Sequence, residues 1–302
     1  MHGTFLAVPG QGSQTLGMGR QLVARHPAAR ATFDESADAL GFDMREVMWG
    51  TSADALTATE YAQPAIVLLA VAAMRAWQAV SRPPSDVRWV AGHSVGALAA
   101  AIVVESLTFV DGIRLARARG QLMGSAPGAG AMLAVAVTSD RARDDLARAA
   151  ASSGLDIACI NSARQIVLSG PREAISEARA RFGSRCRLLD VSHGFHSSLM
   201  DPIVERWASE VAALPFREPR TPLLSALSGR LLRTAGEIEQ DVRHGVRETV
   251  RWDLVTAVAN ESGCRAVILG NGHTLTRLWR GEAVAKGATI VDDGFRNAAH
   301  AA

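Results

Sequence analysis

A glycine-flanked serine stands where the residue pattern changes from strand-like to helix-like. The pentapeptide Gly-His-Ser-Val-Gly at residues 92–96 follows a short β-type run at 87–91 and precedes an apolar run at 97–103, typical of a buried helix. A serine at such a sharp turn holds its hydroxyl above the sheet, and small flanking residues let strand and helix pack closely. A glycine-rich turn with an incidental serine is the alternative. The strand before it and the helix after it favour Ser94 as a nucleophile in an α/β fold.

The composition is that of a globular protein with a packed core. Hydrophobic residues make up 48% of the 302 residues and charged residues 21%, as in ordinary folded domains. The formal net charge of +2 gives no basis for binding nucleic acid or a membrane surface. Aromatic residues, at 5%, are too sparse for a platform that stacks nucleic acid bases.

The number of cysteines and the length of the apolar runs indicate in which cellular compartment the protein is expected. Three scattered cysteines are too few for a disulfide framework or a metal cluster, so we expect buried thiols in a reducing compartment and no metal. The N-terminal apolar run lacks a preceding basic region and is interrupted by Pro9, so it does not resemble a signal peptide. The longest apolar stretch, at 65–74, is too short to cross a bilayer. We therefore expect a cytoplasmic protein without a membrane partner.

The order of predicted elements divides the chain into two units. A strand at 4–8 and helices at 18–25, 28–40 and 63–80 precede the serine turn. Residues 131–191 then read as strand, helix, two strands, helix and strand, with the last strand at 186–191. This β-α-β-β-α-β order is typical of a ferredoxin-like unit. The main layer resumes with a helix after His196 and finishes with a strand at 266–269. We predict an α/β-hydrolase-like core from residues 1–127 and 193–302, and an inserted ferredoxin-like subdomain, a four-stranded sheet with two helices, at 128–192. The subdomain is expected to lean over Ser94 and wall one side of the cleft.

A serine hydroxyl is a weak nucleophile and needs a nearby base, most often histidine. Of eight histidines, two are terminal and two lie in polar contexts. His93 adjoins Ser94, so its side chain points elsewhere and is expected to be structural. His193, His196 and His273 remain as candidates, and no Asp or Glu obviously completes a triad.

At this point the sequence resembles a known family, the malonyl-CoA:acyl-carrier-protein transacylases and the related acyltransferase domains of polyketide synthases. The resemblance rests on ordered motifs spread over almost the whole chain: Val-Pro-Gly-Gln-Gly-Ser-Gln at 8–14, Ala-Gln-Pro-Ala at 62–65, the serine pentapeptide at 92–96, and Phe-His-Ser-Ser-Leu-Met at 195–200. It implies a ping-pong acyl transfer from a CoA thioester, malonyl-CoA above all, to an acyl carrier protein. CoA enters as substrate, and no cofactor is implied.

The resemblance also assigns roles to individual residues. It selects His196 as the base for Ser94, oriented by a backbone carbonyl within 248–252, and it makes the N–H groups of Gln11 and Val95 the oxyanion donors. Arg119 stands where the family places an arginine that grips a free carboxylate, since a guanidinium fork pairs with a carboxylate through two hydrogen bonds. Arg114 and Arg117 are expected to be solvated.

Two further residues bear on substrate choice. The ring of Phe195 is expected to crowd the space that a 2-methyl branch would fill, and Arg251, at a position where fatty-acid members carry glutamine, resembles the polyketide-type domains. Three departures from the family pattern concern the acyl group: Ala97 replaces a usual glutamate, Gly194 a common alanine, and Gly-Asn-Gly-His at 270–273 a usual Gly-Pro-Gly. Three alternatives remain: transfer of an unusual acyl group between two carrier proteins, a role in malonate decarboxylation, and a serine thioesterase or esterase.

Overall fold

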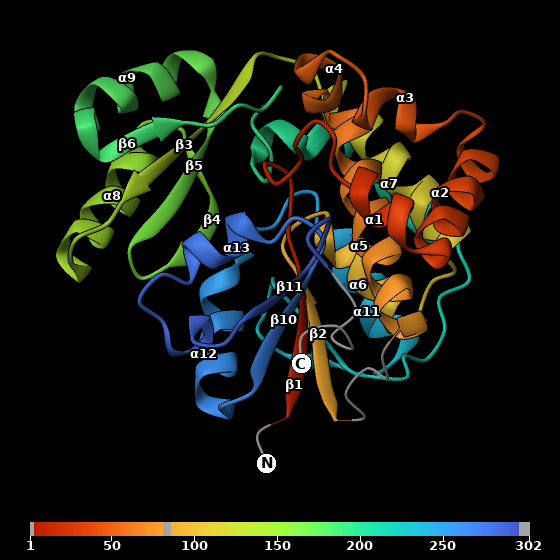
Figure 1. Ribbon diagram of the computed structural model, residues 1–302. Coiled ribbons are helices and arrows are strands. Elements are labelled where there is room, and N and C mark those ends of the chain that lie inside the picture. The colour runs from red at the N-terminus through yellow and green to blue at the C-terminus, as the bar shows by residue number, and fades with distance from the viewer. Residues whose placement is uncertain (1–2, 81–85, 296–302) are drawn as a thin grey trace.

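The computed structural model of the chain describes residues 3–80 and 86–295 (Figure 1). The main sheet has six strands in the order β11-β10-β1-β2-β7-β8. All neighbours in it are parallel except the last pair, β7 and β8. Its strands are β1 (Thr4–Val8), β2 (Val87–Gly92), β7 (Leu223–Leu224), β8 (Leu231–Leu232), β10 (Arg265–Leu269) and β11 (Thr289–Val291). The predicted α/β class is confirmed. The central strands β1, β2 and β10 are almost wholly buried, as parallel strands covered by helices on both faces are.

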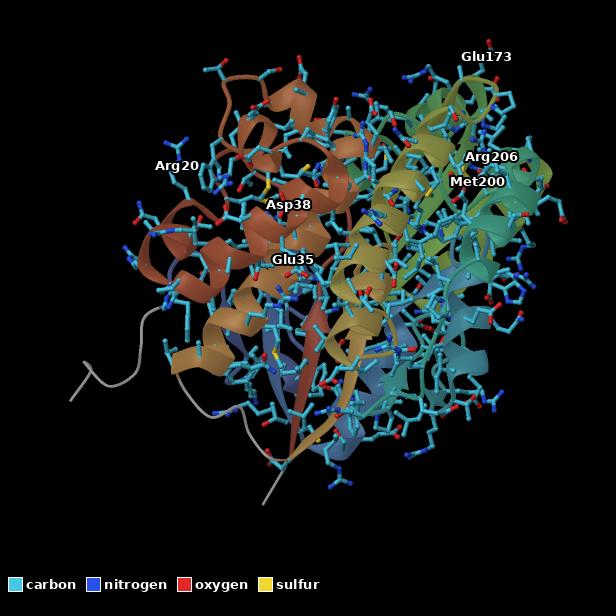
Figure 2. All side chains as sticks on the ribbon, turned by 90° about the vertical axis from the view of Figure 1, so that its right-hand side faces the viewer. Arg20, Glu35, Asp38, Glu173, Met200 and Arg206 are labelled. Carbon is cyan, nitrogen blue, oxygen red and sulfur yellow. The ribbon has the colours of Figure 1, made fainter. Side chains whose placement is uncertain are left out.

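Helices lie on both sides of this sheet, with α5, α6 and α7 to the right of β1 and β2 in Figure 1 and α12 to the left. The helices that precede the second sheet are α1 (Arg20–Arg25), α2 (Pro27–Leu40), α3 (Met44–Met48), α4 (Ala53–Thr57), α5 (Thr59–Val80), α6 (Gly96–Val103) and α7 (Phe109–Gly124). Those that follow it are α10 (Val204–Ala212), α11 (Ala235–His244), α12 (Trp252–Ser262) and α13 (His273–Leu278), with 3-10 turns at Ser198–Ile203 and Ala283–Ala285. Figure 2 shows charged side chains such as Arg20 and Arg206 projecting outward from these helices.

Helix α5 forms the centre of the helical layer. By length and composition alone it could cross a membrane, but 72% of its most apolar window is buried inside the protein. It packs along α2 and α7 and also contacts β10. The helix is therefore apolar because it lies in the core, where every face meets another element.

The second sheet has five strands in the order β6-β3-β5-β4-β9. Residues 130–188 supply four of its strands and both of its helices: β3 (Gly130–Ala136), α8 (Asp140–Ser152), β4 (Asp156–Ser162), β5 (Gln165–Pro171), α9 (Arg172–Phe182) and β6 (Cys186–Leu188), with a 3-10 turn at Gly183–Arg185. The two helices cover one face and enclose a separate apolar cluster that includes Leu133, Leu146, Leu168 and Ile175. The order β6-β3-β5-β4 is that of a ferredoxin-like sheet.

The fifth strand of this sheet, β9 (Val250–Arg251), comes from the part of the chain assigned to the core and pairs in parallel with β4. The prediction of a four-stranded sheet was therefore wrong, because a two-residue strand gives no periodic signal. The division at residues 127/128 and 192/193 stays a prediction.

Several element ends also differ from the prediction. The main sheet does not finish at β10, since β11 pairs on its outer edge. The last strand of the smaller sheet ends at Leu188 instead of residue 191, helix α1 begins at Arg20 instead of 18, and α5 begins at Thr59 instead of 63. The helix after His196 begins as a 3-10 turn and becomes α-helical only at Val204. In that turn Pro202 lacks the N–H that a regular helix would use.

Candidate active site

Ser94 occupies the turn between β2 and α6 and has a left-handed backbone, with φ of 52°. Two glycines make this turn possible. A Cβ on Gly92 would lie 2.0 Å from the Gly96 carbonyl carbon, and a Cβ on Gly96 would lie 2.6 Å from the Val8 oxygen. Strand, turn and helix thus approach too closely for any side chain at either position. A strained φ at a non-glycine residue is typical of functional sites, and here it presents the serine hydroxyl above the sheet.

His196 lies against this hydroxyl. Its Nε2 is 2.7 Å from Ser94 Oγ, and its Nδ1 is 3.0 Å from the backbone oxygen of Glu248. A carbonyl oxygen only accepts hydrogen bonds, so Nδ1 carries a hydrogen and donates a hydrogen bond to the Glu248 carbonyl oxygen. Nε2 is then left with a lone pair that accepts from the serine O–H. The pair is thus arranged for proton transfer from Ser94 to His196.

The surroundings keep His196 neutral. Its pKa is lowered to about 3, first by burial and then by the nearby Arg119 guanidinium and His93 imidazole, while the bond to the Glu248 carbonyl acts in the opposite direction. A base must be unprotonated to accept a proton, and this one remains so throughout the physiological pH range.

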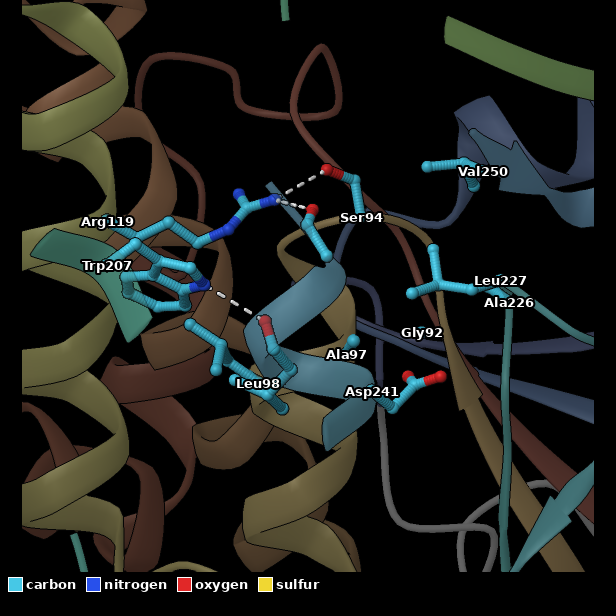
Figure 3. Close-up of a pocket in the computed structure, with 12 residues that line it drawn as sticks. Gly92, Ser94, Ala97, Leu98, Arg119, Trp207, Ala226, Leu227, Asp241 and Val250 are labelled. Carbon is cyan, nitrogen blue, oxygen red and sulfur yellow. Dashed lines mark hydrogen bonds between the residues drawn. The ribbon is translucent and has the colours of Figure 1, made fainter. Parts of the chain in front are cut away.

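Arg119 extends from α7 into the same site and is only 3% exposed. Its Nη1 donates to Gln63 Oε1 at 2.9 Å, and its Nη2 donates to the Gly245 oxygen at 2.8 Å and to Ser94 Oγ at 3.3 Å (Figure 3). Within residues 3–80 and 86–295 no carboxylate forms an ion pair with it. Burial lowers the pKa of Arg119 to about 9, so the guanidinium remains a cation at neutral pH. A buried cation held only by neutral acceptors favours an anionic ligand.

The two other arginines of α7 lie outside the site. Arg114 is exposed and donates to the Ala39 oxygen, as expected for a solvated side chain. The same expectation was wrong for Arg117, which is partly buried, pairs with Glu60 at 2.7 Å and lies over the Tyr61 ring. Its position on α7 gave no signal of this partner, which comes from the start of α5.

Gln11 and Val95 present free backbone N–H groups. Neither group donates to any other residue in the described part of the chain, although Gly96 and Ala97 already donate to the oxygens of His93 and Ser94. The side chain of Gln11 donates to Thr59 Oγ1 at 3.1 Å, which holds the loop after β1 against α5. Their role as oxyanion donors stays a prediction.

The two remaining predicted residues lie at the margin of the site. Phe195 is buried in the main core, with its ring centroid 6.4 Å from that of His193, and it does not line the pocket that contains Ser94 and Arg119. Arg251 makes two hydrogen bonds to Asp253, of 2.9 and 3.0 Å. These bonds raise the pKa of Arg251 and occupy the Nε and Nη2 donors of its guanidinium group. Contacts of either residue with substrate stay predictions.

His93 has the structural position expected of it and links the two sheets. Its Nε2 is 2.8 Å from Asn161 Oδ1 on β4, and its ring lies 5.4 Å from the Trp252 ring. Asn161 in turn donates to Gln165 on β5. The smaller sheet thus contacts the residue next to the nucleophile, but the pocket that contains Ser94 and Arg119 is lined by residues outside 128–192, so the wall expected from that segment stays a prediction.

A small pocket continues from Ser94 and Arg119 along α11, with a volume of about 20 Å³ (Figure 3). Its lining includes Ala97 and the carboxylate of Asp241. Sequence reasoning missed Asp241, because a carboxylate on a polar helix is ordinarily a solvated one. The capping box of Thr234 and Glu237 at the start of α11 could have located the helix, but not the face that lines the site.

The chain matches the acyl transferase domain family over residues 4–284. Among curated relatives, the phenolphthiocerol synthesis polyketide synthase type I Pks15/1 of Mycobacterium marinum is 40% identical over 259 residues. The match covers 82% of this chain but 12% of that protein. The chain therefore spans a small part of the length of the polyketide synthases that it matches.

Two solved structures resemble the chain over nearly its full length. An acyl-carrier-protein-S-malonyltransferase from Bartonella henselae has a TM-score of 0.88 and 31% identity, covering 96% of this chain and 95% of that one. The structure of a type II PKS acyl-carrier protein in complex with its malonyl-transacylase has a TM-score of 0.85 and 29% identity, covering 95% and 94% of the two chains. The similarity therefore extends over nearly the whole length of both chains in each comparison.

Proposed function

Since this chain belongs to the acyl transferase domain family, we propose that it moves a malonyl-type acyl group from CoA to the phosphopantetheine thiol of an acyl carrier protein. The observation that carries the proposal is the convergence on Ser94 Oγ of a neutral base, His196 at 2.7 Å, and a buried cation, Arg119 at 3.3 Å, which has no ion-pair partner among the described residues. A base activates the nucleophile, while a cation selects an acyl group that bears a carboxylate.

In the first half-reaction Ser94 Oγ attacks the thioester carbonyl carbon and its proton passes to His196 Nε2. The carbonyl oxygen becomes an oxyanion, which the free N–H groups of Gln11 and Val95 are placed to stabilise. The C–S bond then breaks, and CoA leaves as a thiol that takes the proton from His196. The product is a malonyl ester on Ser94.

In the second half-reaction the thiol of the carrier protein repeats these steps in reverse order. His196 accepts the thiol proton, the sulfur attacks the ester carbonyl, and the C–O bond to Ser94 breaks as the proton returns to the serine oxygen. The bond from Nδ1 to the Glu248 carbonyl keeps the same tautomer ready for both halves, as the acidic residue of a triad does elsewhere.

The acyl donor and the acyl acceptor in this proposal are taken from similar proteins. The similar structures include a malonyltransferase and an acyl carrier protein in complex with its malonyl-transacylase. We extend both the malonyl donor and the carrier acceptor to this chain, in polyketide or fatty-acid synthesis. All proposed steps use the chain's own side chains and main chain, with CoA as a substrate, and we propose a cytoplasmic location.

The test is acylation of the purified chain by malonyl-CoA, followed by mass spectrometry of the intact protein and of its peptides. The expected adduct is on the peptide that carries Ser94, is lost in Ser94→Ala, and disappears when a carrier protein with its phosphopantetheine arm is added. Ser125→Ala, which changes an exposed serine at the end of α7, is the control that should keep the adduct. His196→Ala is expected to slow acylation about 100- to 10,000-fold. Release of free malonate without transfer would favour a hydrolase instead.

A further inference from the structure

The first two residues of β4 contact both segments that are joined by the orienting bond of His196. That bond connects His196 Nδ1 to the Glu248 oxygen over 3.0 Å. Both residues lie outside regular helices and strands, and His196 has a left-handed backbone with φ of 54°. Their alignment therefore depends on contacts with other parts of the chain.

Asp156, the first residue of β4, holds the histidine side of this bond. Its Oδ2 accepts hydrogen bonds from the Ser198 N–H at 2.8 Å and from the Ser198 hydroxyl at 2.9 Å. Ser198 begins the 3-10 turn two residues after His196. Hydrogen bonds from a backbone N–H to a carboxylate are charge-assisted and strong. Asp156 therefore fixes the loop that carries His196 relative to the smaller sheet.

The second residue of β4 holds the carbonyl side of the bond. Thr249 Oγ1 donates to the Ile157 oxygen at 2.7 Å, and β9, which follows, pairs in parallel with β4. The Glu248 oxygen belongs to the peptide group between Glu248 and Thr249. The Thr249 hydroxyl therefore anchors the peptide group whose oxygen faces His196.

Arg247 joins the two sides to each other. Its Nη1 lies 3.6 Å from Asp156 Oδ1, and its Nε donates to Asp201 Oδ1 at 2.5 Å. Asp201 belongs to the 3-10 turn that Ser198 begins. The side chains of Asp156 and Arg247 are 27% and 35% exposed, and ion pairs at exposed positions add little to the free energy of unfolding. Replacing Asp156 is therefore expected to displace the loop without unfolding the chain.

We propose that Asp156 and Thr249 are positioning residues for the acyl transfer, which keep the Glu248 carbonyl aligned with His196. The inference rests on the proposed function, since it concerns how the base of that reaction is held. Both residues act through the histidine, because neither lines the pocket that contains Ser94.

The reason lies in the tautomer of His196. Only with its hydrogen on Nδ1 does Nε2 have the lone pair that accepts the Ser94 proton. A carbonyl displaced from Nδ1 no longer favours that tautomer, and a serine–histidine pair in the wrong tautomer loses rate. A small displacement of the loop or of the Glu248 peptide group therefore lowers the rate of acylation while the substrate still binds.

The first measurement is single-turnover acylation of Ser94 over a range of malonyl-CoA concentrations. Asp156→Ala should lower the limiting rate by about ten- to hundredfold and change the half-saturating concentration by less than about twofold. Asp156→Asn keeps an oxygen that accepts from the Ser198 N–H and should restore part of the rate. Asp144→Ala, which changes an exposed carboxylate on α8, is the control that should keep the parental rate.

The second measurement reports the tautomer and does not depend on activity. Nitrogen NMR of protein labelled in its histidine rings distinguishes a ring nitrogen that carries a hydrogen from one that does not, and His196→Ala identifies the signals of His196. In the parent the hydrogen is expected on Nδ1. In Asp156→Ala the signals of the Nε2–H tautomer should appear as well. A variant that is merely less stable would keep the parental tautomer in its folded molecules.

Thr249→Val keeps the test decisive if Asp156→Ala does not fold. Valine keeps the branched shape and removes the donor to the Ile157 oxygen, so the limiting rate should fall by about threefold or more, whereas Thr249→Ser should keep it. A parental limiting rate and tautomer in folded Asp156→Ala or in Thr249→Val overturns the proposal. A parent that malonyl-CoA does not acylate overturns the proposed function instead, while the NMR comparison still tests the positioning of His196.

Discussion

Replacing Arg119 with alanine is expected to separate malonyl transfer from acetyl transfer. The guanidinium is 3% exposed and, in the part of the chain that the structure describes, has only neutral acceptors, at Gln63, Gly245 and Ser94. A substrate carboxylate would be its only charged partner there. The variant therefore removes one half of a buried charged pair from the malonyl complex, and nothing comparable from the acetyl complex.

The expected size of the effect follows from this burial. Truncating one partner of a buried, hydrogen-bonded charge pair costs about 2–5 kcal/mol. At about 1.4 kcal/mol per factor of ten, kcat/KM for malonyl acylation of Ser94 should fall by about 30-fold to about 4,000-fold. Acetyl acylation should change far less. Loss of the cation also removes one cause of the lowered pKa of His196, which strengthens the base.

The assay is single-turnover acylation by malonyl-CoA and by acetyl-CoA, read by mass spectrometry. Arg117→Ala is the matched control on the same helix, because that arginine pairs with Glu60 and lies away from Ser94. Thermal unfolding of both variants checks that α7 still packs. Equal losses for the two substrates in a folded Arg119→Ala variant would refute the reasoning and make Arg119 a structural residue.

Four further outcomes are expected. Because the pKa of His196 is lowered from 6.5 to about 3, the imidazole stays neutral as the pH falls through 6.5. A profile of kcat/KM for acylation against pH should therefore show no loss of activity near pH 6.5. A loss of kcat/KM there that fits the binding of one proton would contradict the assignment. In the unfolded chain His196 binds a proton below about pH 6.5, so the free energy of unfolding should decrease as the pH falls from 6.5 toward 3. Urea denaturation at each pH measures this decrease, which should be smaller in His196→Ala. Phe195→Ser should raise the kcat/KM of methylmalonyl-CoA relative to malonyl-CoA, and an unchanged ratio would show that the Phe195 ring does not border the acyl group. Gly92→Ala should abolish acylation or folding, since its Cβ would meet the Gly96 carbonyl carbon at 2.0 Å; circular dichroism distinguishes the two, and a folded, fully active variant would show that the turn is less tight than described.

The parts of the fold that could be read from sequence are those with a local cause. A buried strand, a glycine-bounded turn and an apolar helix follow one another within residues 87–103, so the position of Ser94 follows from neighbours in the chain. The ferredoxin-like order at 130–188 was likewise readable, because its strands and helices are long enough to show their periods. The two-residue strands β7, β8 and β9 were not, because they exist only through pairing with distant strands.

The residues of the site divide in the same way. The resemblance of motifs pointed to His196 and Arg119, but composition and periodicity alone left three histidines and several arginines open. The structure decided among the arginines by burial: Arg119 turns into the site while Arg117 finds Glu60. It also identified Glu248, within the segment 248–252, as the carbonyl that orients His196. A main-chain oxygen is the same in every residue, so no side chain marks it.

By itself the sequence determined the α/β class of the fold, which follows from the order of its strands and helices. It also predicted Ser94 as the nucleophile, because that prediction depends on residues within one turn of each other. Only the tertiary structure decided which histidine faces the serine, which arginine of α7 is buried without an ion pair in the part of the chain that the structure describes, and that Asp241 lines the pocket. Ser94, Arg119, His196 and Asp241 are brought to one site from separate parts of the chain. Their charge states and selectivity depend on burial and on neighbours that only the packed fold supplies.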